Sequence, residues 1–423
     1  MEKRNQKKFN ELRKEFPVFY FDDFKYEVTS KECTVQYFFR VGEYNFQPKM
    51  RLACGKYRRS ETNSEKMKGL LFHIGMVEMV SYWKATCSPE IVIKPYLLNE
   101  IQQEWWKKLY WKGLGEFLYR NGITTEYDTF CQFTFDKNAQ ELTSNDYEYI
   151  PDNQNIIVPI GGGKDSVVTL EHLPREEKRI PFIINPRGAT LNCASRAGFS
   201  HNDEIVILHR PIDKQLLELN AQGFLNGHTP FSAMLAFYTL WVSYCTNTRK
   251  IALSNESSAS EPTIPGTEIN HQYSKSLEFE EDFRTYTQKF MGDCAHYFSF
   301  LRPYTELQIA EMFAQHSQYH DIFRSCNVGS KEDKWCCNCS KCLFAYIILA
   351  PYLSKEKMVA IFGENLLDKP TLQTYFDELT GIAAVKPFEC VGTLEEVNLA
   401  LQAIIPNQKD KFLIQHYIKA KKL

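Results

Sequence analysis

The sequence predicts an α/β protein built on a parallel sheet with helices on both faces. Between residues 156 and 254, apolar runs of strand length alternate with helical stretches, which is typical of parallel strands joined by crossover helices. Strands of period two precede this region, and a mostly helical sequence follows it. We therefore expect three consecutive domains: a small β-sheet and helical amino-terminal domain at 1–150, an α/β domain at 151–350 and a helical carboxyl-terminal region at 351–423.

The composition is ordinary for a soluble globular protein of 423 residues, with 43% hydrophobic and 24% charged residues. A net charge of −2 gives no reason to expect nucleic-acid binding through bulk charge. The basic start lacks a following apolar run, so we expect no secretory signal and a cytoplasmic location. Residues 229–248 carry no charge but include several polar residues, which favours a buried helix over a membrane span. The sequence indicates no oligomeric state.

The amino-terminal region is predicted from its changes of period. Residues 18–52 alternate, with Cys33, Val35, Tyr37, Phe39 and Val41 on one side of a strand, as in a small antiparallel sheet. A helix with one apolar face is expected from residue 65, and a second, rich in Trp and Tyr, over 98–119. We interpret its aromatic residues as core rather than as a ligand platform. Polar residues 143–154 are expected to be a linker.

The predicted strands and helices of the α/β domain indicate where the active site should lie. The sequence predicts strands at 156–160, 180–185, 204–209 and 250–254, with helices from 165 and over 231–245. Ligands bind outside the carboxyl ends of strands in such sheets, so the loops at 161–166, 185–188 and 254–256 should converge on the active site. Further helices are expected at 355–362, 371–379 and 394–405.

The loop between the first of these strands and its helix reads Gly161-Gly162-Gly163-Lys164-Asp165-Ser166. Glycines let backbone N–H groups turn around an anion, and the following helix directs its positive end at the same point. The spacing of the kinase-type phosphate loop is missing. The loop resembles the S-G-G-x-D-S motif of the PP-loop ATP pyrophosphatases, with Gly161 in place of Ser. The resemblance implies that all six residues of this loop bind ATP. The alternative is a plain glycine turn between a strand and a helix.

Three polar stretches carry candidate chemistry. Lys164 is expected to neutralise phosphate charge, and Asp165 to hold Mg²⁺ or orient the loop. The stretch from Ser254 is dense in hydroxyl groups, with a solvated loop as its alternative. The stretch from Asn270 brings His271, Lys275 and two glutamates to a helix start, where Ser274 or Ser276 would otherwise be only an N-cap.

Five of the thirteen cysteines lie between residues 326 and 342, which indicates metal binding or thiol chemistry rather than disulfides in a cytosolic protein. Four thiolates at short spacing suit a structural zinc, with Cys337 left over. The alternative is a loop of reduced thiols that pack as small apolar groups. The candidate ligands are Cys326, Cys336, Cys339 and Cys342.

Read together, several short segments resemble the MurL family of ATP-dependent UDP-N-acetylmuramoyl-L-alanyl-L-glutamate epimerases. The resemblance runs from about residue 19 to residue 392. It implies conversion of the terminal L-Glu of a peptidoglycan precursor to D-Glu, with ATP converted to AMP and diphosphate. The segments are Ser81-Tyr82-Trp83-Lys84, Gly113-Leu114-Gly115-Glu116-Phe117, the glycine loop, Gly227-His228-Thr229-Pro230, the Ser254 and Asn270 stretches, Cys339-Ser340-Lys341-Cys342 and Lys386-Pro387-Phe388-Glu389-Cys390-Val391-Gly392.

An ATP site suits an epimerase because adenylation removes the carboxylate charge that resists loss of the α proton. Two acid/base groups or one mobile group must then act at the α carbon. His271 is the first candidate because imidazole titrates near neutral pH, followed by Glu256, Lys275, His228 and Cys390. Arg187 and Arg196 are candidates for the UDP-sugar. The other candidate substrate contacts are Asn255, Glu256, His228, Tyr273, Ser274 and Glu278.

Two other functions fit parts of this pattern. One is a PP-loop ligase or nitrile-forming enzyme similar to 7-cyano-7-deazaguanine synthase. The other is a nucleotide-binding module without turnover, for which Gly161 is the supporting observation. The first would form AMP from ATP in the presence of a different substrate, and the second would bind ATP without releasing diphosphate.

Overall fold

The computed structural model describes residues 5–59, 64–142, 153–174, 176–200, 203–292 and 294–422. The chain forms two compact units that interleave along the sequence. Unit 1 comprises Met1–Ile157, Val206–Ile251 and Glu268–Tyr297, and unit 2 comprises Val158–Ile205, Ala252–Thr267 and Phe298–Leu423. These units are defined by contacts in space, whereas the three predicted domains are consecutive stretches of sequence. The ranges 1–150, 151–350 and 351–423 therefore stay a prediction.

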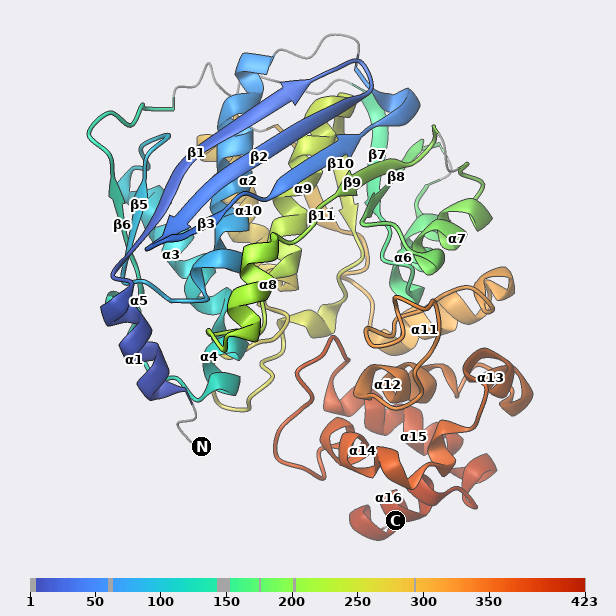
Figure 1. Cartoon of the computed structure of the whole chain (residues 1–423). Helices are drawn as coiled ribbons and strands as arrows, with labels where there is room; N and C mark the ends of the chain where they lie inside the picture. The colour runs from blue at the N-terminus through green and yellow to red at the C-terminus, as the bar shows by residue number, and fades with distance from the viewer. Residues whose placement is uncertain are drawn as a thin grey trace. The chain divides into compact units, whose positions relative to one another are not determined.

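The described chain contains eleven strands of a mixed sheet, together with many helices, as expected for an α/β protein (Figure 1). In unit 1, β1 (Val18–Val28) pairs antiparallel with β2 (Glu32–Val41), which also pairs antiparallel with β3 (Tyr44–Phe46) and β4 (Lys49–Ala53). Every second residue of β2 is buried, so the predicted alternation is confirmed.

The predicted antiparallel sheet is not a separate small sheet. On one side, β5 (Glu90–Ile93) runs parallel to β1, and β6 (Gln132–Phe135) runs parallel to β5. On the other side, β9 (Val206–His209) pairs antiparallel with β4. Backbone hydrogen bonds thus join the amino-terminal strands to a strand that lies about 150 residues later in the chain.

The helices of unit 1 differ from the prediction in two places. Helix α2 (Ser64–Trp83) is buried on nearly all sides from Met67 onward, because it packs against both β1–β2 and α9 (Phe231–Thr246) (Figure 1). The single helix expected over 98–119 is instead α3 (Glu100–Gly113) followed by α4 (Gly115–Asn121). A Cβ on Gly113 would lie 2.8 Å from Pro230, so the absence of a side chain permits this close approach.

The aromatic residues of α3 belong to the core, as predicted: Trp106 and Tyr110 are buried. The remaining helices of unit 1 are α1 (Gln6–Glu15), α5 (Tyr127–Phe130), α8 (Lys214–Ala221) and α10 (Leu277–Phe290).

The predicted strands of the α/β region are confirmed as β7 (Asn153–Pro159), β8 (Arg179–Ile184), β9 and β10 (Thr248–Leu253), and the chain adds β11 (His296–Ser299). Strand β10 runs parallel to β7, as expected for strands joined by crossover connections. Most of the predicted linker, residues 143–152, lies outside the described residues, and Asn153 and Gln154 already belong to β7.

Unit 2 is rich in helices. Helix α6 (Lys164–His172) packs against α11 (Glu306–Ala314), which contacts α12 (Ser340–Leu349), and α12 packs against α14 (Gln373–Thr380) and α15 (Leu394–Gln408). The three predicted carboxyl-terminal helices are confirmed as α13 (Lys355–Phe362), α14 and α15. The unit also contains α7 (Gly188–Arg196) and α16 (Phe412–Lys421).

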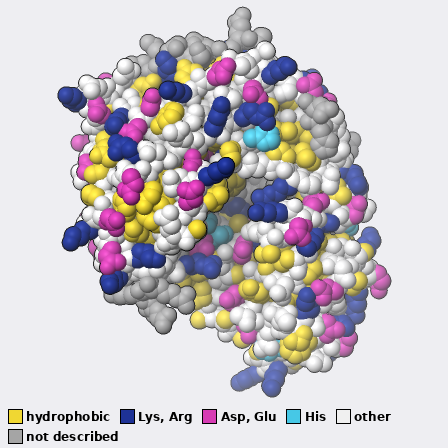
Figure 2. Space-filling view, viewed as in Figure 1, with side chains coloured by type: hydrophobic (Ala, Val, Ile, Leu, Met, Phe, Trp, Pro, Cys, Tyr) yellow, Lys and Arg dark blue, Asp and Glu magenta, His cyan; other side chains and the backbone are white. Residues whose placement is uncertain are grey.

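Charged side chains of both signs are interspersed on the face shown in Figure 2, in keeping with a net charge of −2. The uncharged run at 229–248 lies mainly in α9, where nearly every side chain is buried. Among the described residues, no helix is both long and apolar enough to cross a membrane.

Candidate functional site

The glycine loop joins β7 to α6 and rests on neighbouring backbone. Gly162 has a φ of +81°, and a Cβ there would lie 2.9 Å from the Ala189 carbonyl carbon, so both conformation and space require glycine. The backbone N–H of Arg324 donates to the Gly162 carbonyl at 2.8 Å. At Gly161, by contrast, nothing lies within 4 Å of an added Cβ. A serine would therefore fit at the position where this chain departs from the PP-loop motif.

The side chain of Lys164 is buried and paired with carboxylates, so its contact with phosphate stays a prediction. It is only 4% exposed, and its ammonium pairs with the carboxylates of Asp165 and Glu306, with 2.5 Å between Nζ and Glu306 Oε2. Asp165 is half-buried and Glu306 is 3% exposed. Lys164 is therefore the internal counter-ion of an acidic cluster at the start of α6.

The charges of this cluster are unbalanced. Burial alone would lower the pKa of Lys164, but the charges of Asp165 and Glu306 outweigh it and raise the pKa. Burial raises the pKa of Glu306 to about 8, Lys164 lowers it in part, and the charges of Asp165 and Glu256 raise it further. One ammonium thus serves several carboxylates, and burial favours the protonated form of Glu306.

The stretch after β10 lies beside the same cluster. The Asn255 amide is buried and donates to Ser299 Oγ at 3.0 Å. The backbone carbonyl of Glu256 accepts from Arg302 Nη1 at 2.7 Å. The charge of the buried Glu256 carboxylate raises the pKa of Glu306. Within unit 2 the glycine loop therefore lies beside the start of α7, and Glu256 lies near the acidic cluster. That the loops at 161–166, 185–188 and 254–256 form the active site stays a prediction.

The segment at 386–392 and helix α15 after it reach this cluster as well. Glu396 accepts the backbone N–H of Glu306 with one oxygen and that of Thr393 with the other, both at 2.7 Å, and so joins the starts of α11 and α15. A Cβ on Gly392 would lie 3.0 Å from Glu306 Cγ. Lys386 is buried and paired with Glu261, and Cys390 is half-buried.

Unit 1 contains a second cluster, made of one carboxylate and two imidazoles. Glu116 Oε2 lies 2.5 Å from His271 Nδ1 and 3.1 Å from His228 Nδ1. The ring centroids of the two histidines are 4.7 Å apart. Glu116 comes from α4, His228 from the loop before α9, and His271 from the loop before α10. Sequence reasoning chose both histidines but not Glu116, although Glu116 stands in one of the family segments.

This arrangement favours the neutral form of His228. Burial and the nearby His271 lower the pKa of His228 to about 4, although Glu116 acts in the opposite direction. Burial would raise the pKa of Glu116, but the hydrogen bond from His271 and the charges of both histidines lower it. A carboxylate that accepts from Nδ1 of His271 fixes the tautomer of that imidazole, and the same three side chains could also hold a cation.

Lys84 supports the loop that carries His228. Its buried ammonium donates to the Gly227 carbonyl and to Thr229 Oγ1, the latter at 2.5 Å. Burial lowers the pKa of Lys84 to about 8. The family segments at 81–84, 113–117, 227–230 and 270–280 therefore meet in unit 1, although they are far apart in the sequence.

The other candidates of the Asn270 stretch have mostly structural contacts. Ser276 is the N-cap of α10, which confirms that alternative for this serine. Glu278 pairs with Lys108 at 2.9 Å and Lys112 at 2.8 Å. Tyr273 and Ser274 are buried and Lys275 is half-buried, all three within a short 3₁₀ helix.

The two arginines proposed for the UDP-sugar are exposed side chains of unit 2. Arg187 donates to Ser330 Oγ at 2.8 Å, and Arg196 lies 3.7 Å from Asp321. The candidates thus form two groups: the glycine loop, Asn255, Glu256, Arg187, Arg196 and Cys390 in unit 2, and His228, His271, Tyr273, Ser274, Lys275 and Glu278 in unit 1.

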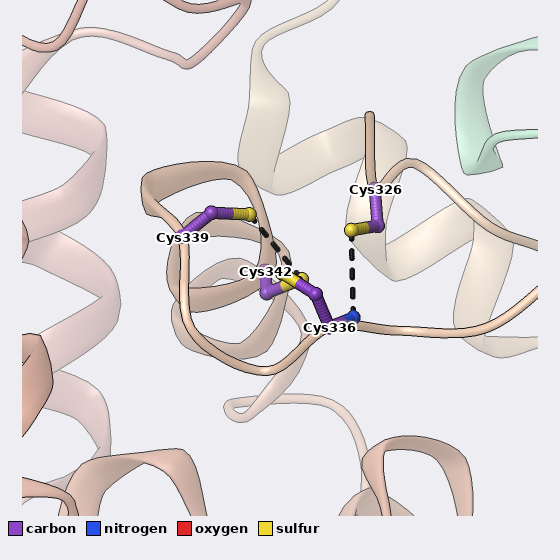
Figure 3. Close-up of side chains that lie close together, drawn as sticks. All are labelled: Cys326, Cys336, Cys339 and Cys342. Atoms are coloured by element: carbon purple, nitrogen blue, oxygen red, sulfur yellow. Dashed lines mark hydrogen bonds between the residues drawn. The ribbon is translucent and has the colours of Figure 1, made fainter. Parts of the chain in front are cut away.

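The four candidate zinc ligands lie together in unit 2 (Figure 3). Their sulfur atoms are within 4.8 Å of one another, and all are free thiols. Hydrogen bonding with Cys342 lowers the pKa of Cys339 to about 5. Cys337 turns away and donates to the Phe362 carbonyl at 3.0 Å, as expected for the cysteine left over.

Comparison with known proteins accounts for nearly the whole chain. Residues 10–300 match the MurL N-terminal domain, and residues 322–422 match the MurL C-terminal domain. The chain belongs to the MurL family. No solved structure matches the chain.

Similar MurL proteins are named UDP-N-acetyl-alpha-D-muramoyl-L-alanyl-L-glutamate epimerase. Those from Salinispora tropica and a Micromonospora strain are each 32% identical over 406 residues, covering 93% of this chain and 86% and 88% of their own length. That from Xanthomonas oryzae pv. oryzae is 33% identical over 371 residues, 84% of this chain and 79% of its own.

Proposed function

We propose that this chain epimerises the terminal L-Glu of UDP-N-acetylmuramoyl-L-Ala-L-Glu to D-Glu in peptidoglycan precursor synthesis, using ATP and releasing AMP and diphosphate. The observation that carries the proposal is identity of 32–33% to relatives named as epimerases of this substrate, over 84–93% of the chain. The two side-chain clusters suit the two kinds of chemistry that the reaction needs.

Activation is assigned to unit 2. A glutamate carboxylate oxygen attacks the α-phosphorus of ATP, the bond to the β-phosphate oxygen breaks, and diphosphate leaves with the electron pair. The glycine loop offers backbone N–H groups and the start of α6 to the phosphates. The carboxylates of Asp165, Glu256 and Glu306 support binding of Mg²⁺ here for two reasons. They carry more negative charge than the Lys164 ammonium can neutralise, and they supply the oxygen ligands that this ion prefers. When bound, Mg²⁺ would neutralise phosphate charge.

The proton step is assigned to the Glu116, His228 and His271 cluster of unit 1. Once the glutamate carboxylate is adenylated, its α proton is more acidic, and a base can remove it from one face. Because Nδ1 of each histidine faces Glu116, the proton-accepting lone pair of a neutral ring belongs to Nε2. One imidazole removes the proton, an imidazolium returns one to the other face, and water then releases AMP and the D-Glu product.

The deciding experiment incubates the chain with UDP-N-acetylmuramoyl-L-Ala-L-Glu, ATP and Mg²⁺, and then determines the chirality of the glutamate after hydrolysis. We expect D-Glu to appear together with AMP and diphosphate, and no D-Glu to form when ATP is left out. D-Glu formation without AMP, or AMP formation only with a carboxylated deazaguanine, would contradict the proposal.

Replacement of His271 by Asn separates the two steps. We expect the variant to stop exchange of the glutamate α proton with solvent deuterium, while substrate-dependent AMP release persists through hydrolysis of the unepimerised adenylate. His209→Asn, in β9, is a matched control expected to retain both signals. Normal deuterium incorporation in His271→Asn would remove this imidazole from the proton step, and loss of AMP release as well would place it in binding.

A further inference from the structure

The four sulfur atoms of Cys326, Cys336, Cys339 and Cys342 have the spacing of a tetrahedral metal site. Zinc bonds to thiolate sulfur at about 2.3 Å, so the edges of a regular tetrahedron are about 3.8 Å. The Cys339 and Cys342 sulfurs are 3.5 Å apart, and those of Cys336 and Cys342 are 3.7 Å apart (Figure 3). Thiols that only fill an apolar core have no reason to surround a common centre.

Backbone hydrogen bonds orient this cluster from outside. The sulfur of Cys326 accepts the N–H of Gly329 at 3.2 Å and the N–H of Cys336 at 3.4 Å. Such bonds stabilise negative charge on sulfur and fix its position, as outer contacts of a metal site do. The adjacent Cys337 provides an internal comparison, because its sulfur points to the Phe362 carbonyl instead.

The segment that carries the first two cysteines also supports the glycine loop. The Arg324 N–H donates to the Gly162 carbonyl at 2.8 Å, and a Cβ on Gly163 would lie 2.7 Å from Ser325 Oγ. Ser330, between the two cysteines, accepts from Arg187 just before α7 at 2.8 Å. Residues 324–330 therefore contact both the glycine loop and the residue that precedes α7.

We propose that Cys326, Cys336, Cys339 and Cys342 bind one structural Zn²⁺ per chain, and that this ion holds the 324–336 segment against the glycine loop so that the loop binds nucleotide. The zinc site stands on the sulfur geometry alone, and only the second half of the proposal rests on the proposed ATP function. The ion has no position left for a reactant when four thiolates bind it, so its role is structural.

Elemental analysis and zinc X-ray absorption of the full chain, purified from zinc-supplemented cells, test the site. We expect about one zinc per chain, with four sulfur neighbours at about 2.3 Å. A zinc content below about a tenth of the protein concentration, or nitrogen or oxygen neighbours in place of sulfur, would overturn the site. This measurement needs no variant, so it decides the matter even if cysteine variants fold poorly.

Variants and zinc removal test the coupling. Cys339→Ser should lose zinc, whereas Cys337→Ser, from the same loop, should keep it. After mild chelation that preserves circular dichroism, we expect affinity for α,β-methylene-ATP, measured by calorimetry, to fall at least about tenfold and to recover when zinc is returned. Unchanged affinity in zinc-free protein would overturn the coupling. Zinc-loaded protein that binds no nucleotide would instead refute the proposed ATP function, while the metal analysis would stand.

Discussion

Replacement of Glu306 by Gln tests the charge balance of the cluster at the glycine loop. Glu306 is buried, and its Oε2 lies 2.5 Å from the Lys164 ammonium, which Asp165 also shares. Burial raises its pKa to about 8 from an ordinary value of 4.5. Gln has nearly the shape of a protonated Glu and keeps an oxygen for Lys164, so the variant should imitate the neutral form.

The sign of the effect follows from proton linkage. The folded protein binds a proton on Glu306 more tightly than the unfolded chain does, so the stabilisation is complete below pH 4.5 and is lost as the pH rises through about 8. At about 1.4 kcal/mol per pKa unit, the difference between 4.5 and 8 sets an upper bound of about 5 kcal/mol. Between pH 5 and pH 8, the wild type should lose about 3 kcal/mol of unfolding free energy that the variant does not lose.

Urea denaturation of both proteins at the two pH values, followed by circular dichroism, measures this difference. Glu311→Gln is the matched control, because Glu311 is an exposed residue of the same helix, α11, and its replacement should leave the pH dependence unchanged. If the unfolding free energies of the wild type and Glu306→Gln change in parallel between pH 5 and pH 8, then Glu306 does not hold the extra proton and the account of the cluster is wrong.

Four further substitutions test the two clusters and the glycine loop. Asp165→Asn should abolish AMP formation with an unchanged circular dichroism spectrum, since this half-buried carboxylate is not part of the core; near wild-type AMP production would refute its assignment. Glu116→Gln should slow α-proton exchange at least about a hundredfold and shift the pH profile to lower pH, because Glu116 raises the pKa of His228; an unchanged rate and profile would remove its positioning role. Gly161→Ser should retain ATP affinity because a Cβ there meets nothing within 4 Å, whereas Gly162→Ala should lose it; equal loss in both would show that the loop geometry is wrong.

Local patterns in the sequence determined the elements and the chemical inventory. The alternation of β2, the position of β7 and α6 around the glycine loop, and the helices α13 to α15 were predicted because strand and helix periods are local properties of the chain. The cysteine spacing and the two histidines were also visible, since residue type alone limits which groups bind metal or transfer protons.

Only the tertiary structure decided which of these groups act together. Glu116 meets His271 across 155 residues, and Lys164 meets Glu306 across 142 residues. In sequence, both glutamates occupy first turns of helices, where a carboxylate ordinarily stays in water and complements the helix dipole. Folding buries them instead beside imidazoles and an ammonium. Because burial and partner charges set the protonation state, the sequence supplied the residues, whereas the packing of distant segments determined their chemistry.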